Sequence, residues 1–116
     1  MRNIIITGMF ILLAACASTA QPDPSGDWLG TMEAPGVSLR VEFQIRSTED
    51  GYSASGISHD QGGQSFPAES VVFDGQAITI NFPIIDGVYR GSLLDDRMEG
   101  TFAQMGFNMP FNLVRQ

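Results

Sequence analysis

The sequence contains no lysine, one cysteine and one histidine. Schiff-base enzymes, hydrolases with a Ser-x-x-Lys motif and Walker-type phosphate loops all require a lysine amine, so these classes are excluded. One cysteine and one histidine cannot form a zinc site of the usual Cys/His type. Six arginines against thirteen acidic residues give a net charge of −7, which argues against nucleic acid as a partner. The 116 residues allow one small domain.

The N-terminus has the pattern of a secretory signal peptide. A short start containing Arg2 is followed by the apolar run Ile4–Ala15, twelve residues long. Twelve residues in a helix are too few to cross a bilayer core of ~30 Å. A charged start, a short apolar run and small residues after it are typical of a signal peptide, which we expect at residues 1–15.

The end of this run carries a more specific motif. Residues 13–16 read Leu-Ala-Ala-Cys, which resembles the lipobox of bacterial lipoproteins. The resemblance implies cleavage before Cys16, a diacylglycerol on its thiol, and a membrane as the first partner. Ala17 in place of Asp after the cysteine implies the outer membrane, on the periplasmic side of the cell envelope. The alternative is ordinary cleavage after Ala20.

Cleavage before Cys16 changes the composition of the chain. It removes Arg2, the only charged residue of the signal, so the remaining 101 residues carry a net charge of −8. No cysteine remains within the domain for a disulfide, and packing alone must stabilise it. Residues 16–25 are small, polar and proline-bearing, which predicts a linker from the lipidated cysteine to a domain at residues 26–116.

The domain shows the alternation of β-strands. In residues 37–46 every odd position is apolar and every even position polar, which predicts a strand with one buried face. Turn signals recur about every ten residues and predict eight strands, at residues 27–34, 37–46, 51–58, 65–73, 76–82, 87–94, 97–103 and 108–115. Such a meander leaves two open edges unless it closes. We therefore expect an all-β, antiparallel up-and-down barrel, closed or nearly closed, with a lipocalin- or avidin-like architecture.

Some strand positions are predicted to face inward. They are Ile78, Ile80, Phe82, Met98, Gly100, Phe102, Phe107, Met109, Phe111 and Leu113. Glycines also lie inside the apparent strands, at positions 30, 56, 91 and 100. A strand glycine packs nothing and weakens the strand. We attribute these glycines to tight coiling or to the close approach of a large side chain across the interior.

Several short glycine-rich motifs occur in a fixed order along the domain. They are Gly26-Asp27-Trp28-Leu29-Gly30, Asp60-Gln61-Gly62, Val71-Val72-Phe73-Asp74-Gly75, Tyr89-Arg90-Gly91-Ser92-Leu93 and Glu99-Gly100-Thr101-Phe102. Together they resemble a small β-rich module found N-terminal to secreted bacterial serine hydrolases of the α/β-hydrolase and β-lactamase-like classes. The resemblance spans residues 26–115 and implies a barrel-like accessory module. No catalytic residue carries over, because the sequence given contains no hydrolase part.

The residues predict no catalytic or metal site. Ser58, His59 and Asp60 are adjacent in sequence, whereas a triad must converge in space, and no Gly-x-Ser-x-Gly motif is present. The acidic pairs lack the spacing of a calcium loop, and no cofactor motif occurs. The large aromatic residues either fill the barrel or line a pocket for an acyl chain. His59, Met105, Phe107 and Met109 are the candidate rim for a ligand or partner.

The sequence therefore predicts a non-catalytic, lipid-anchored binding or accessory module of the cell envelope. One alternative is a carrier that holds a small apolar ligand, an acyl chain or lipid, in its interior. Another is an accessory domain that acts in trans on a secreted hydrolase. A third, a weak enzyme using Asp/Glu chemistry on the barrel surface, would require carboxylates to converge in space.

Overall fold

The computed structural model describes residues 22–116, where the regular structure consists of β-strands and two single turns of 3-10 helix. The first half comprises β1 (Gly26–Ala34), β2 (Val37–Ser47), β3 (Tyr52–Ser58), η2 (His59–Gln61), β4 (Ser65–Pro67) and β5 (Ser70–Phe73). The second half comprises β6 (Ala77–Phe82), η3 (Pro83–Ile85), β7 (Gly87–Leu94), β8 (Arg97–Gln104), β9 (Phe107–Pro110) and β10 (Leu113–Arg115). The predicted all-β class is confirmed.

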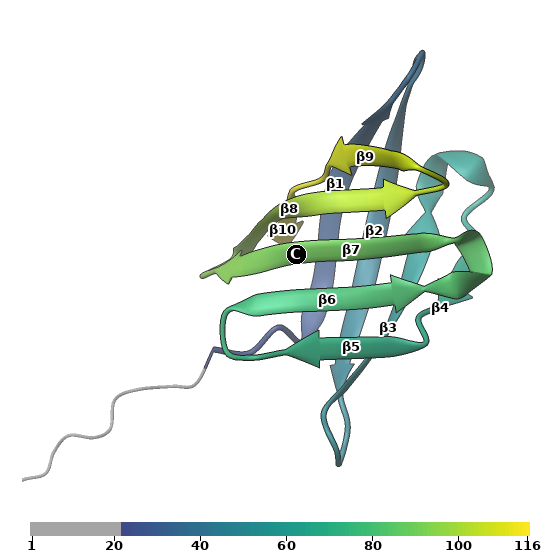
Figure 1. Ribbon diagram of the computed structural model, residues 1–116. Helices are drawn as coiled ribbons and strands as arrows, with labels where there is room; N and C mark the ends of the chain where they lie inside the picture. Colours follow the sequence, from purple (N-terminus) through teal and green to yellow (C-terminus); the bar gives the residue numbers. More distant parts are fainter. Residues whose placement is uncertain (1–21) are drawn as a thin grey trace, which may run out of the picture.

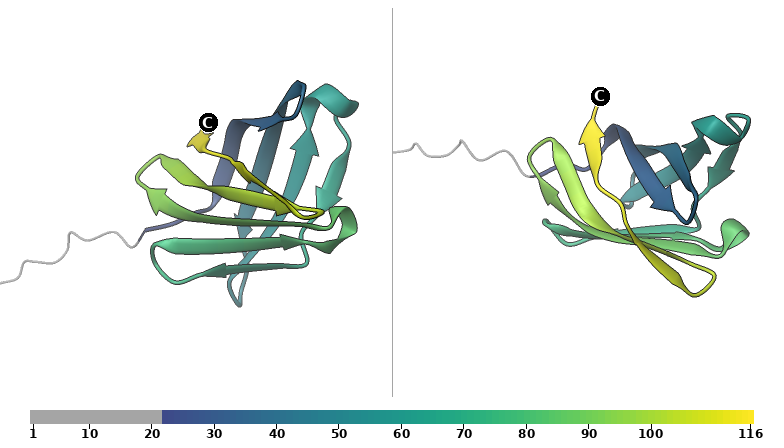
Figure 2. Two further views of the ribbon diagram at one scale, coloured as in Figure 1. Left: turned by 45° about the horizontal axis from the view of Figure 1, so that its top comes forward. Right: turned by 90° about the horizontal axis from the view of Figure 1, so that it is seen from above.

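The strands form one antiparallel sheet in the order β4-β3-β2-β1-β10-β8-β7-β6-β5, with β9 also paired to β8. The sheet curls into a half-barrel in which the layer of β1–β3 crosses the layer of β5–β9 (Figure 1, Figure 2). Six predicted strands are present as single strands, each within one residue of the expected bounds. The other two, at 65–73 and 108–115, are each divided by a bend.

Both bends follow a proline. β4 ends at Pro67 and β9 ends at Pro110, and in each case two residues separate it from the next strand. Proline has no backbone N–H to donate, so it is found at strand edges and ends rather than within a central ladder. The first bent segment pairs with β3 and then β6, and the second pairs with β8 and then also with β1. These two segments join the layers of the half-barrel.

Aromatic side chains fill the space between the layers. The ring of Phe43 lies at the centre, 5.2 Å from that of Phe82 and 5.5 Å from those of Tyr89 and Phe111, measured between centroids. Most of these pairs are edge-to-face or tilted, the geometries that aromatic rings prefer. The predicted inward side chains of β6 and β8 are confirmed as buried: Ile78, Ile80, Phe82, Met98 and Phe102.

Two glycines within strands occupy positions where the structure leaves no room for a side chain. A Cβ atom at Gly56 would lie 2.5 Å from Cε2 of Phe66, whose ring covers that position. A Cβ atom at Gly100 would lie 2.6 Å from Cα of Gly91 and 2.8 Å from Oη of Tyr89. The close approach of a large side chain, one of the two predicted reasons, therefore applies at both positions.

Phe107 is the inward prediction that the structure contradicts. Gln104 pairs with Phe107 across a two-residue turn, in which Met105 and Gly106 have φ angles of 51° and 87°. This hairpin projects past the rest of the barrel (Figure 2), so no facing strand covers its tip and Phe107 is 63% exposed. The remaining predicted inward side chains of this segment are buried: Met109, Phe111 and Leu113.

The chain enters the barrel through a packed segment. Pro24, in the predicted linker, is buried, and its carbonyl oxygen accepts a hydrogen bond of 2.9 Å from Nε1 of Trp28. The Arg115 guanidinium lies 4.3 Å from the centroid of the Trp28 ring and donates to the carbonyl oxygens of Asp23 and Ser25. These contacts fix residues 23–25 against β1 and β10.

The predicted signal peptide at residues 1–15 and the predicted lipidation at Cys16 lie outside the described residues. Within residues 22–116, no helix is long and apolar enough to cross a membrane. The regular structure of the predicted domain begins with β1 at Gly26.

Candidate functional site

Successive turns of this up-and-down sheet lie at alternate ends of the barrel. The two ends differ in the side chains that they expose. The entry end carries residues 22–25 and the β2–β3, β5–β6 and β7–β8 turns. The distal end carries η2, η3 and the β1–β2 and β8–β9 turns. In Figure 1 the dark start of the described chain lies at lower left, and the β8–β9 turn lies at the right.

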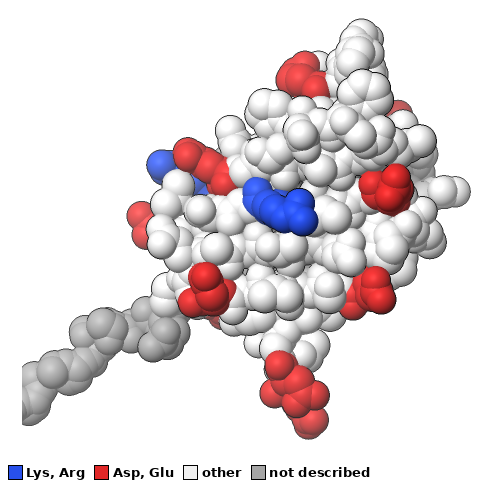
Figure 3. Space-filling model, in the orientation of Figure 1, with Lys and Arg blue, Asp and Glu red and all other residues white. Residues whose placement is uncertain are grey.

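Acidic residues occupy the turns of the entry end. They include Glu49 and Asp50 in the β2–β3 turn, Asp74 in the β5–β6 turn, and Asp95 and Asp96 in the β7–β8 turn. Figure 3 shows acidic side chains outnumbering basic ones on the face it displays, with a group of them on the projection at the bottom. An acidic surface of this kind repels other anionic surfaces at low salt.

Three large apolar side chains are exposed at the distal end. Ile84 in η3 is 67% exposed, and Met105 and Phe107 in the β8–β9 hairpin are 71% and 63% exposed. We call these three residues the distal patch. η3 and β8 are joined by a hydrogen bond of 2.8 Å from Nε2 of Gln104 to the carbonyl oxygen of Ile85. Exposed apolar groups gathered at one end of a small domain are typical of an interaction site.

Two concavities lie beside the distal patch. The first, the distal hollow, has a volume of about 100 Å³ and opens into the core between the layers. Its lining is mainly apolar and includes Met32, Leu39, Phe66, Ile85 and Phe102. The second is a groove of about 290 Å³ along the β8–β9 hairpin, lined in part by Asp86, Val88, Met105 and Phe107. Gln104 lines both, so the hollow and the groove are neighbours.

The backbone of Met105 adds a second observation at this end. Its φ of 51° lies in the left-handed region, which glycine and asparagine adopt more easily than methionine. A non-glycine residue held in this region costs on the order of 1 kcal/mol. The backbone conformation of the turn therefore does not explain why this exposed position is a methionine.

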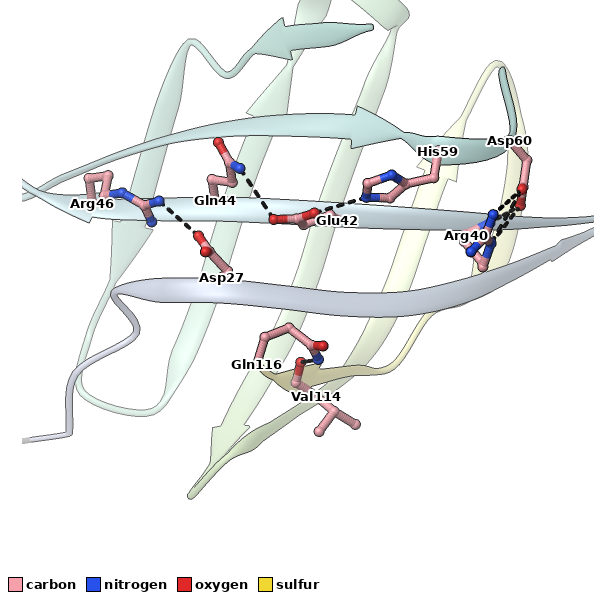
Figure 4. A network of polar contacts seen from close by, with 9 residues as sticks. All are labelled: Asp27, Arg40, Glu42, Gln44, Arg46, His59, Asp60, Val114 and Gln116. Atoms are coloured by element: carbon pink, nitrogen blue, oxygen red, sulfur yellow. Dashed lines mark hydrogen bonds and ion pairs between the residues drawn. The ribbon is translucent and has the colours of Figure 1, made fainter. Parts of the chain in front are cut away.

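His59 belongs to a separate row of polar side chains on the outer face of β2 (Figure 4). Its Nε2 lies 2.8 Å from Oε1 of Glu42, and Oε2 of Glu42 accepts from Gln44 at 3.2 Å. Arg40 forms an ion pair of 2.8 Å with Asp60, and the backbone N–H of Arg40 also donates to that carboxylate. These contacts attach η2 to β2.

The His59–Glu42 pair does not form a catalytic triad. Ser58, adjacent to the histidine, points its hydroxyl at Oε1 of Gln61, 2.8 Å away. Among the described residues, no serine, threonine or cysteine side chain forms a hydrogen bond with His59. A nucleophile must lie within hydrogen-bond reach of its base, so this arrangement supports no acyl-transfer chemistry.

A larger concavity lies at the entry end and has a more polar lining. It has a volume of about 790 Å³, and Asp23, Asp95, Asp96 and Arg115 are among its lining residues. Arg115 is already committed to Oδ1 of Asp96, at 3.0 Å, and to the backbone carbonyls of the entry segment. Within residues 22–116, no group of three His, Cys, Asp or Glu side chains is placed to bind a metal ion.

The Tyr89 hydroxyl is buried, and within residues 22–116 it has no hydrogen-bond partner. Burial, and secondarily the charge of Glu99, raise the pKa of this phenol above its usual value. The group lies over the strand glycines of β7 and β8 rather than in an opening. It therefore serves packing, and it is not an acid or base poised near neutral pH.

The four predicted rim residues are distributed over three places. Met105 and Phe107 lie together at the distal patch, whereas Met109 is 9% exposed and packs in the core. His59 is held on the outer face of β2 by Glu42. Sequence reasoning missed Ile84, which follows a proline in a loop and has no periodic signal. It also missed the hollow, because its lining comes from separate strands.

No protein-family model matches this chain, and no curated protein sequence is similar enough to count as a relative. The resemblance to the module beside secreted serine hydrolases therefore stays a prediction. The geometry of the distal end is the observation from which a function is argued.

Proposed function

We propose that this chain is a lipid-anchored binding module of the bacterial cell envelope that presents its distal end to a partner protein. The proposal places the anchor at Cys16, on the periplasmic side of the outer membrane. It assigns no chemistry to the domain.

One observation carries this proposal: the three exposed apolar side chains of the distal patch lie at the end of the barrel opposite the entry of the chain. Ile84, Met105 and Phe107 are each more than half exposed there, while the entry end carries acidic turns. A tether at Cys16 would keep the acidic end near the membrane and direct the distal patch away from it. Apolar side chains that point away from the membrane are placed to contact a protein rather than the lipid of that membrane.

The interior supports this proposal over an acyl carrier. Aromatic rings occupy the space between the layers, and the hollow that opens into it measures about 100 Å³. Small-molecule sites usually measure about 300–1,000 Å³. A secreted hydrolase encoded elsewhere is one possible partner protein. The proposal therefore includes the alternative in which the chain acts in trans on such a hydrolase.

The anchor is tested by fractionating cells that express the wild-type chain or the Cys16→Ala variant. We expect the wild-type chain in the outer membrane and the variant in the soluble periplasmic fraction. A variant that stays with the membrane would contradict the anchor, whereas release of the variant would leave the partner to a second test.

The partner is tested by placing a photo-crosslinking amino acid at Met105 or Phe107 in growing cells. Matched controls carry it at Val72 on β5 or Val114 on β10, which are also exposed apolar positions (63% and 56%). We expect one discrete crosslinked product from the two distal positions and none from the two controls. Equal products from all four positions would contradict a specific distal surface.

A further inference from the structure

We propose that the distal hollow is the anchor pocket for one branched aliphatic side chain, Leu or Ile, of a partner polypeptide, and that a Lys or Arg flanks that side chain. This inference rests on the proposed function and narrows it to the chemistry of the bound segment.

The hollow is built from both layers of the barrel. Its walls come from Met32 on β1, Leu39 on β2, Phe66 on β4, Ile85 in η3 and Phe102 on β8. The layers meet at β10, which pairs with both β1 and β8 near the entry end, and they diverge toward the distal end (Figure 2). The opening therefore follows from the bend that lets one segment serve both layers.

The volume selects the size of the group that enters. An apolar cavity of about 150 Å³ admits benzene. A hollow of about 100 Å³ therefore accepts a smaller group, such as the four-carbon side chain of Leu or Ile. A long acyl chain exceeds this volume.

Two polar side chains of the hollow donate hydrogen bonds within the domain. The Ser58 hydroxyl donates to Oε1 of Gln61, and Nε2 of Gln104 donates to the carbonyl oxygen of Ile85, each at 2.8 Å. Because most of the lining is apolar, shape and apolar contact decide what enters. A small, desolvated pocket of this kind is typical of the anchor sites that dominate protein interfaces.

The charge around the opening selects the flanking residue. Asp86 follows Ile85 directly and lines the neighbouring groove with Met105 and Phe107. Within residues 22–116, Asp86 is recorded in no ion pair. A cation beside the aliphatic side chain would complement this carboxylate, whereas a second copy of the same acidic chain would be repelled.

The test uses the full processed chain in lipid nanodiscs and three capped synthetic pentapeptides. The probe is Arg-Thr-Leu-Thr-Arg, and its two controls replace the central Leu by Ser or both Arg by Glu. Binding is followed by NMR through the side-chain methyl groups of Met32, Leu39 and Ile85, which line the hollow. We expect saturable shifts with the probe at up to about 10 mM, and at least tenfold weaker binding of each control.

Two variants on one strand locate the site. Leu39→Trp places a large ring in the mouth of the hollow, while Val37→Trp puts the same ring two residues away at an exposed position that does not line it. We expect at least tenfold weaker probe binding for Leu39→Trp and a change within twofold for Val37→Trp. Retained core methyl shifts verify that both variants are folded.

Three results would overturn the inference: no saturable shift with the probe, equal binding of the Leu and Ser peptides, or unchanged binding to Leu39→Trp. Dodecyl maltoside monomers that shift the same methyl groups at lower concentration than the probe would assign the hollow to lipid and also overturn it. If one of these results is obtained but the crosslink from position 105 is still formed, the inference about the hollow is wrong and the proposed distal partner surface is retained.

Discussion

Replacing Gly100 with valine tests the packing that closes the barrel interior. Gly100 on β8 faces Gly91 on β7, and the Tyr89 ring lies over both. A Cβ at position 100 would lie 2.6 Å from the Gly91 Cα and closer still to the carbonyl oxygen of Arg90. Two of these obstacles are backbone atoms, so the strands must separate or the buried tyrosine must leave its site.

Overpacking of a core typically costs about 1–3 kcal/mol, and displacement of a buried aromatic ring about 3–5 kcal/mol. We therefore expect Gly100→Val to lower the free energy of unfolding by at least about 3 kcal/mol. Thr101→Val, at the neighbouring exposed position of the same strand, should change it by less than about 0.5 kcal/mol.

The measurement is urea unfolding followed by the fluorescence of Trp28, the single and fully buried tryptophan. For a domain of this size, the loss in Gly100→Val corresponds to roughly 12 °C or more in Tm. Equal stability of the two variants would refute the argument that aromatic coverage, rather than chance, explains the strand glycines.

Four further outcomes are expected. Tyr89→Phe should leave stability unchanged or raise it by about 1 kcal/mol, because the hydroxyl it removes is buried and unpaired. Its raised pKa also means that wild-type stability falls as pH rises above about 10, by up to ~1.4 kcal/mol per pH unit, and the variant should lack this fall. Arg115→Gln should cost about 1–3 kcal/mol in urea unfolding and expose residues 23–25 to proteases, since it loses the contacts to Trp28 and the entry carbonyls. Asp60→Asn should flatten the acid side of the Tm–pH profile. The hydrogen bonds and charge of Arg40 lower the pKa of this carboxyl, so its contribution is present above about pH 4 and is lost as pH falls through the folded-state pKa. Met105→Asn should raise stability by about 0.5–1 kcal/mol and remove the crosslink formed from position 107, which would separate stability from binding.

The strands were predictable because their signals are local. Alternation along residues 37–46 and turn residues such as Asp95-Asp96 specify a hairpin without reference to the rest of the chain. The bends were not predicted, although Pro67 and Pro110 stand at both. A proline in a strand pattern signals an edge or an end, and only the sheet order shows that each bend passes between layers.

The candidate site was predictable only in part. Met105 and Phe107 were identified because residues 105–109, near the last hairpin, are apolar and include two flexible methionines. The hollow depends on residues from β1, β2, β4, β8 and η3, whose convergence no local signal encodes. His59 was predicted as a rim residue, and its contact with Glu42, seventeen residues away, forms only when η2 folds against β2.

The pairing of β10 with β1 affects how the chain folds. β1 pairs with β2 on one side and with β10, at residues 113–115, on the other, so the first strand of the domain pairs with the last. Contacts over such a separation in sequence make folding slow, because a long loop must close before they form. A chain exported as proposed would stay open while it crosses the inner membrane. The sheet would be completed only when β10 pairs with β1 on the far side.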